Sequence, residues 1–456
     1  MSALWTAAEA VAATLGRATH SFAATGLSID SRTLKAGDLY VALKGEHHDG
    51  HNFLAAAFAA KAAAALVARP PKDAPAEAPL LIVADTLRGL EDLARAARAR
   101  SSAKIVAITG SAGKTTTKEM LRLACGALGP THASGASFNN HWGVPFSLAS
   151  LPREAAYGVF EIGMNHFGEI RALVCFVRPH AALITAIAPA HLEFFGSCEA
   201  IADAKSEIFE GLVPGGAAVL PAGNPYTERL AARAKQLGVA RLLRFGETQG
   251  SEARLLSCEE TGEGVRAKAD ILGKPVEFRL GAQGRHNAVN ALGALLTVAA
   301  VEGDVLNAAA ALREFSALKG RGARFTAGGI EVIDESYNAN PASMAAALAL
   351  LGAAKGRRIA VLGDMLELGE GGAALHAGLA PALEAARVDL VFLSGPLMAA
   401  LWEKLPASRR GAYAANSAEL APSVAAALQE GDTVLIKGSH GSRMAAIVEL
   451  LRGRKG

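Results

Sequence analysis

The chain has 456 residues, more than one ordinary hydrophobic core accommodates, so we expect two or three domains. Its composition, 51% hydrophobic and 20% charged, is typical of a soluble globular protein, and 46 basic against 43 acidic residues provide no electrostatic basis for binding nucleic acid or a membrane surface. Its four cysteines form no C-x-x-C pair, which argues against a disulfide scaffold or a zinc site of the usual spacing. Because the first residues lack the basic segment of a signal peptide, we expect a cytoplasmic protein without membrane insertion.

Residues 1–100 are expected to form one small α/β domain. A helical opening is followed by a strand-like segment, DLYVAL (38–43), and by an alanine-rich helix from Phe53. LLIVAD (80–85) predicts a second strand, and GLEDLARAARAR (89–100) predicts a helix leading out of the domain. The proline-rich segment 69–79 between them predicts a surface loop.

Residues 101–318 are expected to form a central domain on a mostly parallel sheet. Apolar runs at 104–109, 157–162, 181–187 and 217–222 alternate with amphipathic helices, as strands buried on both faces do. Between 246 and 280, polar and apolar residues alternate instead, which predicts antiparallel strands flanking that sheet.

Residues 319–456 are expected to form a third, Rossmann-like domain, beginning in the glycine-rich basic segment KGRGARF. IEVID (330–334), RRIAVLGD (357–364), VDLVFLSG (388–395) and DTVLIKGS (432–439) are each followed by a loop and a helical pattern. That arrangement predicts a doubly wound sheet, which binds ligands at the carboxyl ends of its strands.

The strongest chemical signal is the segment KIVAITGSAGKTTTKEML, in which an apolar strand turns through glycines into a helix. Glycine-rich backbone can close around phosphate, the Lys114 ammonium can neutralise it, and the Thr115 hydroxyl can bind magnesium. The usual P-loop has glycine six residues before the lysine, where this chain has Ile108, so the loop is shorter than the Walker form. The alternative is a glycine turn containing GKT by chance.

Three further polar residues follow strands of the same domain. Glu161 ends the strand YGVFE, His191 follows ALITAIA, and Lys205 lies on the next helix. Singly, each has an ordinary interpretation: a solvated rim carboxylate, a structural histidine and an exposed helix lysine. Their succession at strand ends of a phosphate-binding domain favours a functional role.

Several motifs together resemble the Mur ligases, over nearly the whole chain from Ser28 to Met444. The segments that carry the resemblance are TGSAGKTTTKEM, SFNNHWGVPFSL, FEIGMNHFGEI, APAHLEFFGS, AKSEIF, RHNAVNAL, DESYNANPASM and VLGDMLELGE. The shortened phosphate loop of that family also accounts for Ile108.

The resemblance implies the roles of individual residues. ATP would be bound by Gly110, Ser111, Ala112, Gly113, Lys114, Thr115, Thr116, Asn287, Asn290, Arg321, Asp334 and Asn338. Mg²⁺ would be held by Thr115, Glu161, His191 and Lys205, the last as a carbamate. Lys114, Lys205, His191 and Arg321 would be the catalytic residues, and Ser31, Arg32, Asn139 and Asn140 would face the sugar-nucleotide substrate.

The resemblance also implies a reaction and its partners. UDP-MurNAc-tripeptide and ATP would form an acyl phosphate, which D-alanyl-D-alanine would attack to give the amide. The enzyme is expected to act as a monomer, with its third domain closing over the second to exclude water. No residue stands out as the base for the incoming amine.

Four alternatives stay open. The Mur ligase that adds the third amino acid usually carries a D-N-P-R motif, where this chain has GDMLELG (363–369). A folylpolyglutamate synthetase would share the ATPase layout without the uridine-pocket segment, and a P-loop switch protein would show an N-K-x-D motif. EHHDGH (46–51) could form a transition-metal loop, although the resemblance favours a polar loop on the substrate side, with 49–53 near the uridine.

Overall fold

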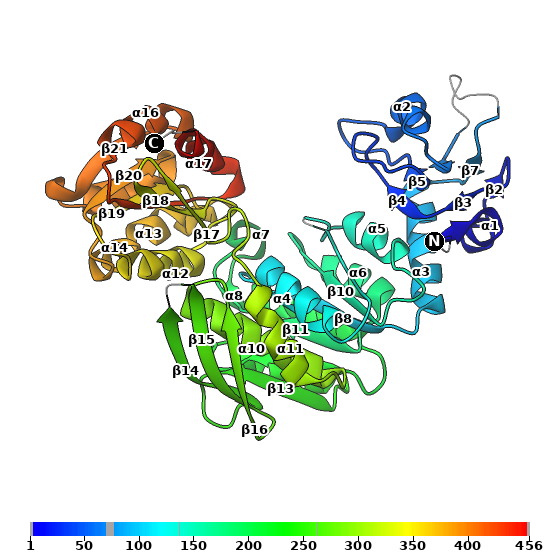
Figure 1. The fold of residues 1–456 in the computed structure, drawn as a ribbon, viewed down its shortest axis with the longest axis horizontal. Helices are drawn as coiled ribbons and strands as arrows, with labels where there is room; N and C mark the ends of the chain where they lie inside the picture. Colours follow the sequence, from blue (N-terminus) through cyan, green and yellow to red (C-terminus); the bar gives the residue numbers. More distant parts are fainter. Residues whose placement is uncertain (1–2, 70–76, 136, 262, 454–456) are drawn as a thin grey trace. The chain divides into compact units, whose positions relative to one another are not determined.

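The computed structural model describes residues 3–69, 77–135, 137–261 and 263–453 (Figure 1). Most of the predicted proline-rich loop, residues 70–76, lies outside the described residues. The chain has a three-domain, mixed α/β fold whose sheets are mostly parallel. By internal packing it divides into two compact units, one of residues 1–108, 129–182 and 207–216, the other of the remaining residues.

The N-terminal domain is built on a five-stranded sheet in the order β2-β7-β6-β5-β4. The strands are β2 (Arg17–Ala18), β4 (Gly26–Ser28), β5 (Asp38–Val41), β6 (Ala64–Val67) and β7 (Leu80–Ile82), and a separate pair joins β1 (Trp5–Thr6) to β3 (Ala23–Ala24). The helices are α1 (Ala7–Thr14), the 3₁₀ helix η1 (Gly50–Phe53), α2 (Leu54–Ala59) and α3 (Thr86–Arg100). Strands β4 to β7 are parallel, and only β2 runs antiparallel.

The alanine-rich stretch after Phe53 contains a strand that the sequence did not indicate. Helix α2 ends at Ala59, Lys61 adopts a left-handed φ of +67°, and the chain continues as β6. All four residues of β6 are buried between β5 and β7, so none shows polar alternation. A uniformly apolar run does not distinguish a buried strand from a buried helix.

The central domain carries a nine-stranded sheet in the order β16-β15-β14-β13-β12-β11-β8-β10-β9. Its strands are β8 (Lys104–Thr109), β9 (Thr131–Ala133), β10 (Tyr157–Glu161), β11 (Ala181–Ile184), β12 (Ala217–Pro221), β13 (Arg241–Gly246), β14 (Ala253–Thr261), β15 (Gly264–Ile271) and β16 (Lys274–Leu280). Its helices are α4 (Lys114–Gly126), α5 (Gly143–Ala149), α6 (Glu169–Val177), α7 (Leu192–Phe195), α8 (Cys198–Ser206), η2 (Glu207–Gly211), α9 (Thr227–Gln236), α10 (Arg285–Ala300), α11 (Val305–Ala311) and η3 (Leu312–Glu314). As predicted, β14, β15 and β16 are antiparallel, and buried and exposed residues alternate along β16 because one of its faces meets solvent.

The C-terminal domain has a six-stranded sheet in the order β17-β18-β22-β19-β20-β21. Its strands are β17 (Ala323–Ala327), β18 (Ile330–Glu335), β19 (Arg358–Gly363), β20 (Leu390–Ser394), β21 (Arg410–Ala414) and β22 (Thr433–Lys437). Its helices are α12 (Pro341–Gly352), η4 (Gly369–Gly371), α13 (Gly372–Ala377), α14 (Ala380–Ala385), η5 (Pro396–Met398), α15 (Ala399–Lys404), η6 (Ala407–Arg409), α16 (Ser417–Ala427), η7 (His440–Ser442) and α17 (Ala445–Arg452). All pairs are parallel except β17–β18, as a doubly wound sheet requires.

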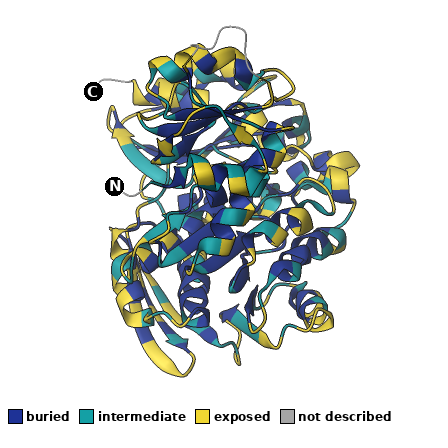
Figure 2. Cartoon of the chain, turned by 90° about the vertical axis from the view of Figure 1, so that its right-hand side faces the viewer, coloured by how far each residue is buried: buried dark blue, intermediate teal, exposed yellow. Residues whose placement is uncertain are grey.

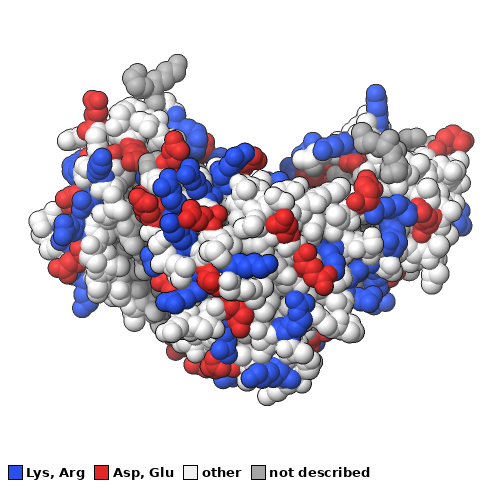
Figure 3. All heavy atoms as spheres, turned by 60° about the horizontal axis from the view of Figure 1, so that its bottom comes forward, with Lys and Arg blue, Asp and Glu red and all other residues white. Residues whose placement is uncertain are grey.

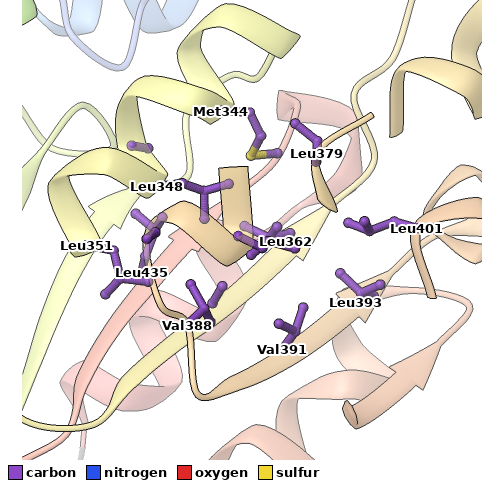
Figure 4. Close-up of a cluster of buried hydrophobic side chains, with 14 of the residues drawn as sticks. Met344, Leu348, Leu351, Leu362, Leu379, Val388, Val391, Leu393, Leu401 and Leu435 are labelled. Atoms are coloured by element: carbon purple, nitrogen blue, oxygen red, sulfur yellow. The ribbon is translucent and has the colours of Figure 1, made fainter. Parts of the chain in front are cut away.

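Side chains of this sheet pack alternately into two hydrophobic cores. Ala360 and Leu362 of β19 lie in the core under α12 and α14, part of which Figure 4 shows, whereas Ile359 and Val361 face α16 and α17. Because both faces are covered, the strand is apolar from Ile359 to Leu362. Figure 2 shows buried residues of the chain in dark blue and exposed residues in yellow.

Charge is distributed evenly on the face that can be seen, and none of the described helices is suited to a bilayer. On the face in Figure 3, basic and acidic side chains are interspersed. Among the described residues, no helix has the length and hydropathy needed to cross a membrane.

Candidate functional site

The predicted phosphate loop connects β8, which ends at Thr109, to α4, which begins at Lys114. Gly110 has φ +153°, and a Cβ atom there would lie 1.9 Å from the Thr185 hydroxyl oxygen. Gly113 has φ +80°, and its Cβ atom would lie 3.0 Å from the Asn290 side-chain amide. Both positions therefore require glycine, and the helix after them points its positive N-terminal end at the loop.

Hydrogen bonds to the segment after β11 hold this loop in shape. The Ser111 N–H donates to Ala186 O at 2.8 Å, and the Ser111 hydroxyl accepts from the Ala188 N–H at 3.1 Å. The Thr185 hydroxyl donates to Ala112 O at 2.5 Å. The loop is thus preorganised by its neighbours, and the Ser111 N–H is engaged by the segment after β11.

Two lysines lie at this loop in different environments. Lys114 Nζ donates to Gly110 O at 2.8 Å, so its ammonium is held across the mouth of the loop. Lys205 on α8 is only 1% exposed. Burial, and then the positive charge of Lys114, hold the pKa of Lys205 well below its usual range. The amine of Lys205 is therefore neutral over a wider pH range than that of a solvated lysine.

His191 is the N-cap residue of α7, and its side chain makes a hydrogen bond with a residue of the C-terminal domain. Its backbone is left-handed, with φ +61°, and its Nδ1 atom lies 2.5 Å from Oε2 of Glu367. The hydrogen bond from His191 lowers the pKa of Glu367, which keeps that carboxylate ionised. His191 is thus held by a residue of another domain.

Glu161, Asn139 and Asn140 belong to the first packing unit. Glu161 ends β10, is 3% exposed, and accepts a hydrogen bond from Asn139 Nδ2 at 2.9 Å. The Asn140 side chain accepts from the Gly143 N–H at 2.9 Å at the start of α5. The structure therefore brings Glu161 and Asn139 together and gives Asn140 a helix-capping contact.

Asn287, Asn290 and Arg321 have contacts that fix their positions. Asn287 is buried in the first turn of α10 and donates to Gln283 O at 2.7 Å, and Asn290 lies against Gly113 one turn later. The Arg321 guanidinium lies 3.9 Å from the centre of the Tyr337 ring, a cation–π contact. Asn290 is therefore the member of this group placed at the phosphate loop.

Asp334 and Asn338 lie at the carboxyl end of β18. Asp334 is 1% exposed, and its oxygens accept from the Gly320 N–H at 3.0 Å and from the Ser336 hydroxyl at 2.6 Å. Asn338 is exposed, and its main-chain carbonyl oxygen accepts a hydrogen bond from Lys437 Nζ at 2.9 Å. In this arrangement Asp334 ties the segment before β17 to the end of β18.

The N-terminal residues Ser31 and Arg32 follow β4. Arg32 is exposed and pairs with Asp30 at 2.6 Å, and that guanidinium lowers the pKa of the Asp30 carboxyl. In the neighbouring 46–51 loop, His51 Nδ1 lies 2.6 Å from Asp49, and His51 Nε2 accepts from the Ala68 N–H at 3.0 Å. Both ring nitrogens are engaged, and no group of three His, Cys, Asp or Glu side chains suited to a metal ion occurs in the described parts of the chain, so the structure does not support the transition-metal alternative for this loop.

Three residues of the site were not singled out from the sequence: Thr185, Glu367 and Asn340. Asn340 is buried at the start of α12, and its Nδ2 donates to Ser111 O of the phosphate loop at 3.3 Å. Each of the three contacts a residue far away in the sequence. Local sequence patterns therefore could not identify these contacts, and the only available signal was that the residues lie near the ends of predicted strands.

A cavity of about 460 Å³ opens elsewhere on the C-terminal domain. It is lined by Arg324, Lys355 and Thr433 among others, at the amino ends of β18 and β22. The candidate residue Asp334 lies at the opposite, carboxyl end of β18, so this cavity is separate from the site.

Three family models match the chain in order. Residues 23–99 match the Mur ligase family catalytic domain, 108–298 the Mur ligase middle domain, and 320–440 the Mur ligase glutamate ligase domain. The chain is 36% identical over 430 residues to the UDP-N-acetylmuramoyl-tripeptide–D-alanyl-D-alanine ligase of Escherichia coli (strain K12), covering 93% of each chain.

Solved structures agree with these matches. The fold is similar to MurF from Acinetobacter baumannii, with a TM-score of 0.86, 32% identity and 98% of each chain covered. It is also similar to the MurF ligase from Thermotoga maritima in complex with ADP, with a TM-score of 0.77, 25% identity, and 93% of this chain and 96% of that chain covered.

Proposed function

The chain belongs to the Mur ligase family, and from this premise we propose that it joins D-alanyl-D-alanine to UDP-N-acetylmuramoyl-tripeptide at the expense of ATP. The observation that carries the proposal is the identity of 36% to a ligase of that name, over 93% of each chain. The reaction would yield the pentapeptide nucleotide, ADP and phosphate, during the cytoplasmic stage of peptidoglycan precursor synthesis, with the enzyme acting as a monomer.

Each domain has its own part in this proposal. Residues 1–100 bind the UDP-MurNAc-peptide, residues 101–318 bind ATP, and the Rossmann-like residues 319–456 complete the nucleotide site. Ser31, Arg32, Asn139 and Asn140 contact the sugar nucleotide. Support comes from the order of the three matching family models, which begin at residues 23, 108 and 320.

ATP binding is proposed at the phosphate loop. The glycine cradle, the helix N-terminus and the Lys114 ammonium suit phosphate oxygens, and the similar Thermotoga maritima structure holds ADP. Gly110, Ala112, Gly113, Thr115 and Thr116 supply the loop and first helical turn, while Ser111 shapes it. Asn287, Asn290, Arg321, Asp334 and Asn338 surround the rest of the nucleotide.

Magnesium is proposed beside the phosphates, with Thr115, Glu161, His191 and Lys205 as the residues that would hold it. The Thr115 hydroxyl and the Glu161 carboxylate are hard oxygen donors of the kind that Mg²⁺ prefers, so these two side chains fit the ion. An ammonium would not fit, but Lys205 is buried with a lowered pKa, which favours the neutral amine from which a carbamate forms. When bound, the ion would neutralise charge on the transferring phosphoryl group.

The reaction has two steps. A carboxylate oxygen of the tripeptide attacks the γ-phosphorus of ATP. The bond between that phosphorus and the departing ADP breaks, and an acyl phosphate forms. The amine of D-alanyl-D-alanine then attacks the acyl carbon, phosphate leaves, and the amine loses a proton. Lys114 and Arg321 neutralise charge on the phosphoryl oxygens, because such transfers depend chiefly on alignment and electrostatics.

A comparison of amine substrates tests the proposed function. With UDP-MurNAc-tripeptide and ATP, we expect phosphate release with D-alanyl-D-alanine to exceed that with any free amino acid at least about 10²-fold, because a site built to bind a dipeptide leaves polar groups unpaired with a shorter amine. The control is UDP-MurNAc-dipeptide with diaminopimelate or lysine. Equal or faster turnover in that control would assign the chain to third-residue addition instead.

A further inference from the structure

His191 of the central domain and Glu367 of the C-terminal domain meet at 2.5 Å, between residues far apart in the sequence. We propose that Glu367 is a positioning residue, which orients the His191 ring and sets its tautomer. His191 would then be able to act as a metal ligand only when the C-terminal domain places Glu367 against it. The inference rests on the proposed function in one respect, namely that His191 helps to hold Mg²⁺ at the ATP site.

The chemistry of the pair assigns the proton. An ionised carboxylate only accepts hydrogen bonds, so the Nδ1 atom of His191 must carry the hydrogen that it shares with Glu367. In the neutral ring, the lone pair is then left on Nε2. A carboxylate behind a histidine commonly fixes the ring orientation and makes the other nitrogen a better ligand.

The backbone reinforces the side-chain contact. The Glu193 N–H donates to Glu367 O at 3.1 Å, and Leu192 packs against the core of the C-terminal domain. His191 and Glu367 both have left-handed backbones, with φ of +61° and +62°. Such conformations are strained for residues other than glycine, and they persist where surrounding contacts hold them.

The loop that carries Glu367 is fixed by hydrogen bonds to other parts of the C-terminal domain. The Met365 N–H donates to Nε2 of the fully buried His376, and the Leu366 N–H donates to the Ser439 hydroxyl, each at 2.9 Å. The Asp364 carboxylate accepts from the Met398 N–H at 2.9 Å. Because these hydrogen bonds fix its loop, Glu367 can hold the His191 ring with the accuracy that a catalytic site requires.

Glu367→Ala tests the proposal, with Glu370→Ala as the matched control. Glu370 is an exposed carboxylate three residues farther along the same loop. We expect Glu367→Ala to raise the Mg²⁺ concentration needed for half-maximal rate by about 10- to 100-fold, the usual effect of removing a carboxylate behind a ligand histidine. The KM for the UDP-linked substrate should stay unchanged. Glu367→Gln, which retains an acceptor oxygen, should be intermediate.

The second readout does not depend on turnover. In protein labelled with ¹⁵N-histidine, the His191 resonances, identified by their loss in His191→Gln, should report the Nδ1–H tautomer in wild type and in Glu370→Ala. They should move toward a tautomer mixture in Glu367→Ala.

The two readouts separate the possible failures. An unchanged tautomer and Mg²⁺ requirement in Glu367→Ala would overturn the positioning role, as would an equal loss in Glu370→Ala. If Glu367→Ala did not fold, the same criteria would apply to Glu367→Gln. Failure of wild type to form the amide would overturn the proposed function, and the tautomer measurement would still decide the role of Glu367.

Discussion

Lys205→Arg is expected to lose activity by roughly 10²- to 10³-fold or more, the effect of removing an electrostatic group from a reacting site. Lys205 is 1% exposed, and burial, followed by the charge of Lys114, lowers its pKa well below the usual range. A neutral amine adds carbon dioxide and loses a proton, which yields an anionic carbamate on a long arm. A guanidinium stays protonated and cannot react in this way, so arginine would place a positive charge where an anion is needed.

Rescue experiments distinguish a carbamate from a merely structural lysine. Lys205→Ala should also be inactive, but acetate or another short carboxylic acid should partly restore its rate by supplying the missing carboxylate. Lys114→Ala is the control, because it removes a cation and should gain nothing from the same acids. Near-normal turnover of Lys205→Arg would contradict the carbamate assignment.

The direction in which activity should change with pH follows from the lowered pKa of Lys205. Since the pKa of Lys205 is lowered, the amine is neutral above that lowered value and becomes protonated as the pH falls through it. Carbamate, and with it activity, should therefore be lost on the acidic side, and depletion of bicarbonate should deepen that loss.

Lys114→Ala is expected to lower kcat by roughly 10²- to 10³-fold, with a smaller effect on the KM for the tripeptide nucleotide. Lys114 lies at the start of α4, and its ammonium is held by Gly110 O at 2.8 Å across the loop. Phosphoryl transfer places charge on the equatorial oxygens, and a fixed cation stabilises that charge more in the transition state than in the ground state.

An exposed lysine on α9, Lys235, provides the control for this substitution. Lys235→Ala should retain the wild-type kcat, since its side chain is solvated and lies on a helix without site residues. Steady-state kinetics at saturating ATP would check both variants. A Lys114→Ala enzyme with wild-type kcat would remove Lys114 from the catalytic residues.

The parts of the fold that local patterns encode could be predicted from the sequence. Strand β8, the glycine turn and α4 carry their own signals, since glycine, lysine and threonine at this spacing have a local physical reason. The two cores that cover β19 follow from its continuous apolar run. By contrast, β6 was missed because its buried residues show neither a helical nor an alternating period.

The candidate site was less predictable, because its contacts join distant segments. Nothing near Glu367 in the sequence indicates that its partner is His191, and nothing near Asn340 indicates Ser111. Asp334 could be placed at a strand end, but its bond to the Gly320 N–H depends on the antiparallel pairing of β17 with β18. Such contacts arise from tertiary packing and have no local signature.

The measurement that tests the central claim most directly follows oxygen through the reaction. UDP-MurNAc-tripeptide labelled with ¹⁸O in the carboxylate that reacts is incubated with ATP, D-alanyl-D-alanine and the enzyme, and both products are weighed by mass spectrometry. Ligation through an acyl phosphate transfers one carboxylate oxygen to phosphate. We therefore expect the pentapeptide nucleotide to form together with phosphate that carries one ¹⁸O atom. Unlabelled phosphate, or ADP formed without the pentapeptide nucleotide, would contradict the account.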